Sequence, residues 1–176
     1  MDDSSAVWLA ERTRITEAIY RIAYYNDQND WQNFAAGFTD PVEIDFSATP
    51  YGGDRSHLVP RAAWIAAASS PTRIRKTQHH ESVYWVEING NQATSVTYVI
   101  ARHFLNGPDG SQYALDEGGY YTHTLIKSEG IWRVRKLKYK QLWAHGDPQA
   151  ERMVKEDGLS QGWADLYGGK ADLPAR

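Results

Sequence analysis

Apolar residues recur at helical spacing over the first part of the chain, stop at a short polar break, and then resume. Before the break, the residues at steps of three and four are Ile15, Ile19, Ile22 and Ala23. After the break, they are Trp31, Phe34, Ala35 and Phe38. Such steps are typical of one buried helix face. The pattern predicts a first helix from about Ser5 to Tyr25, capped by Asp3, Ser4 or Ser5, and a second helix from Asp30 to Phe38.

The break contains one carboxylate, Asp27, between the two apolar faces. Its side chain is a helix cap, a buried acid with a partner, or an exposed group. Asp30 directly precedes Trp31 and is the better cap residue for the second helix. Asp27 is therefore available for another role.

The pattern changes twice between residues 39 and 71. Thr39-Asp40-Pro41 ends the second helix in this interpretation, and residues 42–46 alternate like a strand. Residues 47–57 contain Pro50, Gly52 and Gly53 and are predicted to form a loop. A third helix begins near Pro60 and ends before Pro71.

From Ile74 onward the apolar positions follow the two-residue period of strands. We predict strands over 75–88 and 92–105, joined by a turn at Asn89-Gly90-Asn91, and strands over 118–126 and 131–143, joined by a turn at 128–130. A short polar helix follows over 148–156. The order predicts an α+β fold, with N-terminal helices on one face of a curved antiparallel sheet in a cone-shaped α+β barrel. Residues 1–147 form this domain, and residues 148–176 are a tail that belongs to it or makes an oligomer contact.

Composition narrows the functional classes. The chain has 19 Lys and Arg against 22 Asp and Glu, so its charge gives no reason to expect nucleic acid as a partner. It has no cysteine, which excludes disulfides and thiolate chemistry and fits a reducing compartment. No secretory signal or membrane-length apolar stretch is visible, so we expect a cytoplasmic protein without a membrane partner. Seven Trp and eleven Tyr suit either an aromatic core or a pocket for a ring-shaped ligand.

Three histidines, His79, His103 and His123, lie in predicted strands. Because strand side chains alternate between faces, His79 and His80 point to opposite sides. His103 ends a face of small residues, as the wall of a pocket does; the others on that face are Thr97, Val99 and Ala101. The alternative is that each histidine is an ordinary core or surface residue.

A contact between an aspartate and a histidine would favour a functional role for that histidine over an ordinary structural one. A carboxylate bonded to one ring nitrogen fixes the tautomer and makes the other nitrogen a better base. A plain helix cap is the competing account of Asp27. The histidines show no HxxxH, HExxH or Glu-x-x-His spacing, so we predict no metal site.

Several short segments together resemble a known family. YYNDQNDW, TQHH, ARHF, GGYYTHTLIKSEGIWRV and a terminal W-x-x-G occur in an order similar to the SnoaL-like branch of the nuclear transport factor 2-like superfamily, over roughly residues 15–147. Scytalone dehydratase and bile acid 7α-dehydratase are the members it resembles. The resemblance implies a cone-shaped α+β barrel, no cofactor and a homo-oligomer, with a trimer favoured over a dimer.

The resemblance also assigns roles to individual residues. It implies that His79 is the catalytic histidine, Asp27 its acidic partner and His103 a second histidine in the site. The substrate-binding positions that it implies are Tyr25, Phe46, Tyr121, His123 and Trp143. Two departures argue against scytalone as the substrate, because Asn26 and Phe46 stand where scytalone dehydratase has tyrosines.

Three functions follow from this interpretation. The first is a cofactor-independent lyase that uses an Asp–His dyad as general base on a small aromatic or polycyclic alcohol. Its reaction is dehydration, a related elimination or retro-aldol deformylation. The second is an isomerase or cyclase of a polyketide or steroid-like ketone. The third is a non-catalytic ligand-binding module or the small subunit of an oxygenase.

Overall fold

The computed structural model describes residues 3–49, 52–69, 74–150 and 152–153. Three helices and six strands occur in it in the order α1 (Asp3–Asp27), α2 (Trp31–Ala36), β1 (Phe38–Ala48), β2 (Gly52–Val59), α3 (Arg61–Ser69), β3 (Ile74–Asn89), β4 (Gln92–Asn106), β5 (Gln112–Ser128) and β6 (Ile131–Gly146). The helix predicted over 148–156 is described in part: residues 148–150 and 152–153 are helical, and residues 151 and 154–156 lie outside the described residues.

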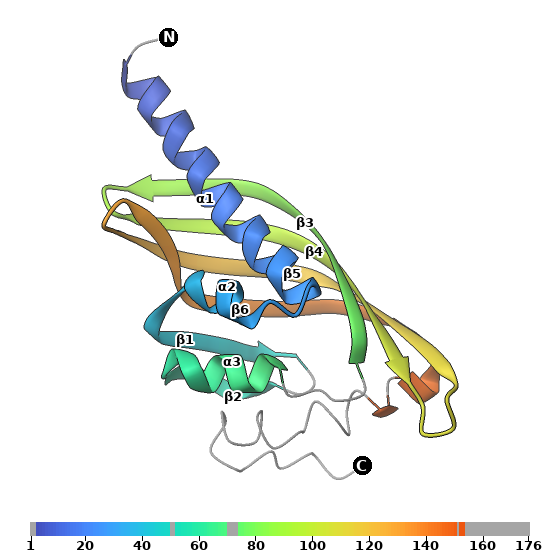
Figure 1. The fold of residues 1–176 in the computed structure, drawn as a ribbon. Coiled ribbons are helices and arrows are strands. Elements are labelled where there is room, and N and C mark those ends of the chain that lie inside the picture. The colour runs from blue at the N-terminus through green and yellow to red at the C-terminus, as the bar shows by residue number, and fades with distance from the viewer. Residues whose placement is uncertain (1–2, 50–51, 70–73, 151, 154–176) are drawn as a thin grey trace.

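The six strands form one curved, unclosed sheet in the order β2-β1-β6-β5-β4-β3. Neighbouring strands are antiparallel except β1 and β6, which run parallel. Helix α1 crosses one face of the sheet, and α2 and α3 lie near β1 and β2 (Figure 1). The predicted α+β class and its curved sheet with N-terminal helices are confirmed.

The core lies between these helices and the sheet. Ile15 and Ile19 of α1 are fully or almost fully buried against the sheet, as their spacing predicts. Phe34 of α2 packs edge-on against Phe38 of β1 and near Trp64 of α3. Burying these large apolar side chains favours folding by roughly 1.5–3 kcal/mol each. The helices are therefore held to the sheet mainly by this aromatic and aliphatic layer.

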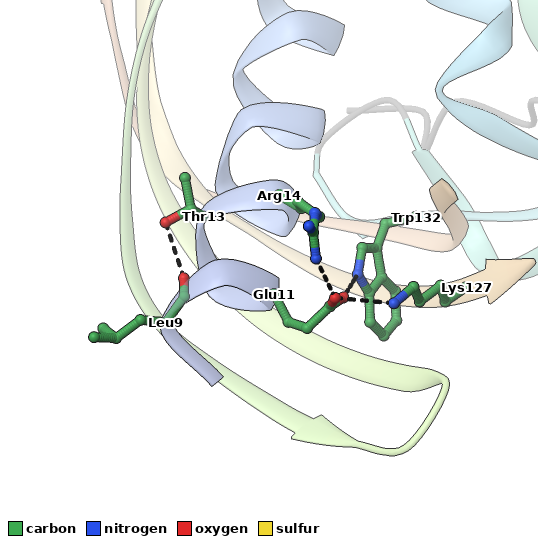
Figure 2. Close-up of polar contacts among 6 residues, drawn as sticks. All are labelled: Leu9, Glu11, Thr13, Arg14, Lys127 and Trp132. Carbon is green, nitrogen blue, oxygen red and sulfur yellow. Dashed lines mark hydrogen bonds and ion pairs between the residues drawn. The ribbon is translucent and has the colours of Figure 1, made fainter. Parts of the chain in front are cut away.

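A polar cluster also anchors the first half of α1 (Figure 2). Glu11 accepts hydrogen bonds from Nζ of Lys127 at 2.9 Å and from the indole N–H of Trp132 at 2.7 Å. These two partners lie on β5 and β6, on either side of their connecting turn. The cluster anchors α1 at Glu11, and Asp27 is the last residue of the same helix.

The second helix ends earlier than its apolar pattern indicates. Asp30 caps α2 by accepting a hydrogen bond from the backbone N–H of Asn33 at 3.1 Å, as predicted. The helix stops at Ala36, and Gly37 donates its N–H to the carbonyl of Phe34 at 3.1 Å. A Cβ at Gly37 would lie 2.5 Å from Ile22, so glycine permits a close approach to α1 here. Phe38 therefore belongs to β1 and not to the helix.

Two further predictions between residues 38 and 59 are wrong. Thr39-Asp40-Pro41 does not form a break but lies inside β1, with a cis bond between Asp40 and Pro41. The predicted loop over 47–57 contains most of β2, which pairs antiparallel with β1 at the sheet edge. Glycine weakens a strand through its conformational freedom but keeps both backbone hydrogen-bonding groups, so Gly52 and Gly53 did not exclude a strand.

The long hairpins were predicted well apart from their ends. β3 and β4 meet at the predicted Asn89-Gly90-Asn91 turn, where Gly90 has a positive φ of 58°. β5 begins at Gln112, six residues before the predicted start at Gly118, and β6 continues to Gly146. The extra residues pair along the full length of β4 and β5, from Asn106 opposite Gln112 onward.

Candidate active site

A cavity of about 210 Å³ lies between the helices and the sheet. Its apolar walls come from α1, α2, α3 and β1 and include Ile19, Ile22, Trp31, Phe34, Phe46 and Trp64. The titratable residues that line it project from the four long strands: Lys76, His79 and Glu81 of β3, His103 of β4, Glu117, Tyr121 and His123 of β5, and Tyr139 of β6. An apolar hollow with a few polar groups is the usual form of a small-molecule site.

Asp27 and His79 meet at the edge of this cavity, 52 residues apart in the chain. Oδ1 of Asp27 lies 2.6 Å from Nδ1 of His79, and Oδ2 accepts the backbone N–H of His79 at 2.8 Å. The hydroxyl of Thr77 donates to Oδ1 at 2.8 Å. The side chains of His79 and Asp27 are only 8% and 16% exposed. The aspartate therefore fixes both the ring and the backbone of His79.

The charge state of Asp27 follows from these contacts. Burial raises the pKa of its carboxyl group, but the hydrogen bonds from His79 and Thr77 outweigh burial and leave the pKa below its usual value. Asp27 is thus a carboxylate at neutral pH. A carboxylate at Nδ1 keeps the proton on that nitrogen and leaves the lone pair of Nε2 for a ligand in the cavity.

His103 lies diagonally from His79 on the neighbouring strand β4, where it pairs with Thr77, and the two ring centres are 6.3 Å apart. Burial lowers the pKa of His103, and the carboxylate of Glu117, 3.7 Å from its Nδ1, offsets part of that effect. Nδ1 of His103 is buried and has no hydrogen-bond partner among the described residues. Glu117 also accepts a hydrogen bond from the side chain of Gln141 at 2.9 Å.

His123 is only 3% exposed and lies next to an aromatic wall. Its Nδ1 is 3.3 Å from the hydroxyl of Ser95, and burial lowers the pKa of the ring to about 3, so the ring is neutral at physiological pH. The wall consists of Tyr121, Tyr139 and Phe46, with ring centres 4.8 Å apart in the first pair and 5.7 Å apart in the second. Burial raises the pKa of Tyr121 well above its usual value, so its hydroxyl keeps its proton.

Two of the expected substrate-binding residues lie outside the cavity lining. Trp143 is 44% exposed, and its ring covers Gly118 on the outer side of the sheet. The cause is a register shift in the β5–β6 ladder: Gly119 pairs with Gln141 but Gly118 pairs with Trp143, which leaves Leu142 as an extra residue. Tyr25 is half-buried against the core and is not among the lining residues. Residues two apart on a helix point in nearly opposite directions, so Tyr25 and Asp27 diverge.

Glu81, Glu117 and Tyr139 are among the polar residues of the cavity that were not singled out from the sequence. Glu81 follows His79 by two positions on β3, and strand alternation could have placed it on the same face. Glu117 and Tyr139 have no such local signal, because the ladders bring them there: Glu117 pairs with Ala101, and Tyr139 with Tyr121.

Two wider features of the described part of the chain bear on function. No group of three or more His, Asp or Glu side chains there is arranged to hold a metal ion. No helix in the same residues is long and apolar enough to cross a membrane.

Comparison with protein-family profiles identifies the family of the protein. The profile of the SnoaL-like domain matches residues 8–138, about three quarters of the chain, and the protein belongs to that family. The resemblance drawn from the short segments is thereby confirmed. A search of curated protein sequences gives no significant match.

Several solved structures share the fold. The Kfla4162 protein of Kribbella flavida is similar with a TM-score of 0.70 and 25% identity, over 77% of this chain and 93% of that one. A Novosphingobium aromaticivorans protein, provisionally named a scytalone dehydratase, has a TM-score of 0.69 and 21% identity, over 80% of this chain and 90% of that one. The hexachlorocyclohexane dehydrochlorinase LinA-type3 of Novosphingobium barchaimii has a TM-score of 0.63 and 15% identity, over 80% of this chain and 92% of that one. The structural neighbours of this fold therefore include proteins named as a dehydratase and a dehydrochlorinase.

Proposed function

We propose that this protein is a cofactor-independent lyase acting on a small aromatic or polycyclic alcohol, with His79 as the general base. The observation that carries the proposal is the buried Asp27–His79 pair at the edge of an apolar cavity. The names of the dehydratase and dehydrochlorinase neighbours favour elimination among the reactions that such a pair can catalyse.

In this proposal, Nε2 of His79 removes an acidic proton from the substrate. Asp27 does not touch the substrate; it is a positioning residue that holds the ring and stabilises the imidazolium that forms. His103 supplies a hydrogen bond from the opposite strand to a substrate oxygen. The aromatic wall of Phe46, Tyr121 and Tyr139 contacts a flat ring. The same base acting on a hydroxyl proton would give retro-aldol loss of an aldehyde, which is the second form of lyase chemistry that the site can support.

The first prediction concerns His79→Ala. We expect it to reduce turnover about 100-fold or more, because general-base catalysis contributes about 100- to 10,000-fold. A suitable first probe is the β-hydroxy ketone formed from benzaldehyde and acetone, tested within a panel of aryl-substituted analogues. Dehydration releases benzylideneacetone and retro-aldol cleavage releases benzaldehyde, so chromatography of the products also identifies the reaction.

His80→Ala is the matched control, because His80 is the neighbouring histidine on β3 and is exposed on the other side of the strand. It should keep wild-type turnover. Equal rates for wild type and His79→Ala across the panel would contradict the proposed base.

An isomerase remains the second candidate, because the buried, protonated hydroxyl of Tyr121 is a suitable donor to a substrate ketone. Product mass separates the two reactions, since an isomer keeps the mass of the substrate and a dehydration product is lighter by water.

A further inference from the structure

Glu81 is a titratable group in the cavity that the Asp27–His79 pair does not use. It projects from β3 on the same face as His79, two residues further along, and lines the cavity. The residue as a whole is only partly buried, but its Oε2 is inaccessible to solvent and has no hydrogen-bond partner among the described residues. A buried carboxyl oxygen without a partner is costly, which is a reason to expect that a ligand satisfies it.

The surroundings of Glu81 disfavour its charged form. Burial raises the pKa of Glu81 to about 7; the negative charge of Asp27 acts in the same direction, and His79 opposes both. Tyr121 on β5 also interacts electrostatically with it. Around the rest of the cavity lie His103, Glu117, His123 and Tyr139, and Lys76 is exposed at the margin. Close to neutral pH, a large fraction of Glu81 therefore carries a proton.

We propose that the neutral carboxyl group of Glu81 is the proton donor to the substrate oxygen. The inference rests on the lyase proposed above and adds its acid. In the elimination, His79 takes the proton from carbon, the C–H electrons form the double bond, and the C–O bond breaks. The Glu81 proton moves to the departing hydroxyl, which leaves as water. Glu81 is then a carboxylate and His79 an imidazolium, and transfer of one proton from His79 to Glu81 restores both.

Glu81 suits this role better than His103 does. Burial lowers the pKa of His103, so its ring is mostly neutral, and a neutral imidazole is a very weak acid. A carboxyl group that titrates near the working pH is protonated often enough and still releases its proton readily. His103 then binds the oxygen, while Glu81 protonates it. A base and an acid on one strand face also imply that the proton and the hydroxyl leave from the same side of the substrate.

A ketone binding experiment tests the donor without turnover. α-Tetralone labelled with ¹³C at its carbonyl can accept a hydrogen bond but cannot donate one. In wild type, infrared spectroscopy should show a carbonyl stretch lowered by hydrogen bonding at acidic pH, and this shift should be lost as pH rises through about 7. In Glu81→Gln the amide N–H donates at every pH, so the shift should be independent of pH. Identical pH dependence in the two proteins would overturn the inference.

A pair of leaving groups tests the acid during turnover. Acetate leaves without protonation and hydroxide does not, so the benzaldehyde–acetone hydroxy ketone is compared with its acetate ester. We expect Glu81→Gln to lose about 100-fold on the alcohol, as expected for a missing general acid, and only a few-fold on the ester. Glu87→Gln, the same change at an exposed position of β3, is the control and should match wild type on both.

The outcomes separate this inference from the proposed function. Equal losses on alcohol and ester in Glu81→Gln would overturn the acid while His79→Ala still tests the base. Should wild type turn over neither substrate, the lyase proposal would fail for this substrate class, and the ketone experiment would decide alone whether Glu81 donates to a bound oxygen.

Discussion

At the scale of single residues, Asp27 fixes His79 through both of its carboxylate oxygens. Thr77 adds a third contact from the same strand, at 2.8 Å. These contacts connect the end of α1 to β3. The charge of Asp27 selects the tautomer of the His79 ring. Loss of the charge and loss of one hydrogen bond should therefore have different effects.

Asp27→Asn is predicted to lower kcat about 100-fold or more, because replacing the aspartate that orients a general-base histidine leaves the ring in the wrong tautomer. The amide can present N–H to Nδ1, which would shift the proton to Nε2 and remove the base. Nitrogen NMR of His79 should show a single Nδ1–H tautomer in wild type and a changed tautomer in the variant.

Thr77→Val is the control for this prediction, because it removes one hydrogen bond to Asp27 and keeps the charge and the side-chain shape. It should keep the wild-type tautomer and most of the activity. The positioning role of Asp27 would be contradicted by an Asp27→Asn enzyme with unchanged kcat and an unchanged tautomer.

At the scale of elements, the contact of Asp27 with β3 depends on how α1 lies across the sheet. The Glu11 cluster connects α1 to the sheet nearer the N-terminus of the helix (Figure 2). The hydrogen bonds from Lys127, Trp132 and Arg14 outweigh burial and lower the pKa of Glu11 to about 2. The carboxylate connects α1 to the β5–β6 hairpin and stays charged over the working range of most proteins.

Glu11→Gln should lower the free energy of unfolding by about 1 kcal/mol, because it weakens the partly buried, charge-assisted hydrogen bonds from Lys127 and Trp132. Urea denaturation measures the change. Glu17→Gln on the same helix is the control: Glu17 pairs with Arg21 at 3.2 Å in a solvent-exposed ion pair, and such pairs contribute little. Equal stability of wild type and Glu11→Gln would refute the anchoring role.

At the scale of the whole molecule, several groups with shifted pKa values shape the dependence of stability on pH. The pKa of His123 is about 3 when folded against 6.5 for a free ring, so the unfolded chain binds an extra proton between these values. Glu11, whose pKa is about 2 in the folded state against 4.5 for a free carboxyl, acts in the same direction between these two pH values. Glu81 acts in the opposite direction, because its folded pKa of about 7 lies above 4.5 and the folded state holds the extra proton.

The contributions of His123 and Glu81 oppose each other between pH 4.5 and 6.5, and His103, whose pKa burial also lowers, acts in the same direction as His123. We therefore expect the free energy of unfolding to rise only gently with pH in that range and to fall steeply below pH 4.5, where His123 and Glu11 act together. In Glu81→Gln the opposing contribution is absent, so stability should rise more steeply with pH from 4.5 to 6.5. Urea denaturation at a series of pH values checks this, and parallel curves for the two proteins would show that Glu81 does not titrate as described.

The sequence by itself determined the features that depend on local pattern. The apolar steps of Ile15 and Ile19 gave α1, the capping side chain of Asp30 gave the start of α2, and Asn89-Gly90-Asn91 gave the first long hairpin. These follow from the periods of helix and strand and from the conformations that a few residues favour, all within a short window of chain. The family followed from short segments in a fixed order, and the SnoaL-like domain match agrees with it.

Only the tertiary structure decided which distant groups meet and which way side chains point. The contact between Asp27 and His79 was a hypothesis from the sequence, and its geometry depends on how α1 crosses the sheet. One extra residue at Leu142 turned Trp143 to the outer side, and no local signal marks that register shift. The state of Glu81 depends on burial by other elements, because a carboxyl group changes its pKa through surroundings that are distant in sequence. The contacts and charge states of the side chains in this cavity are therefore set by non-local packing, while the elements that build it are set locally.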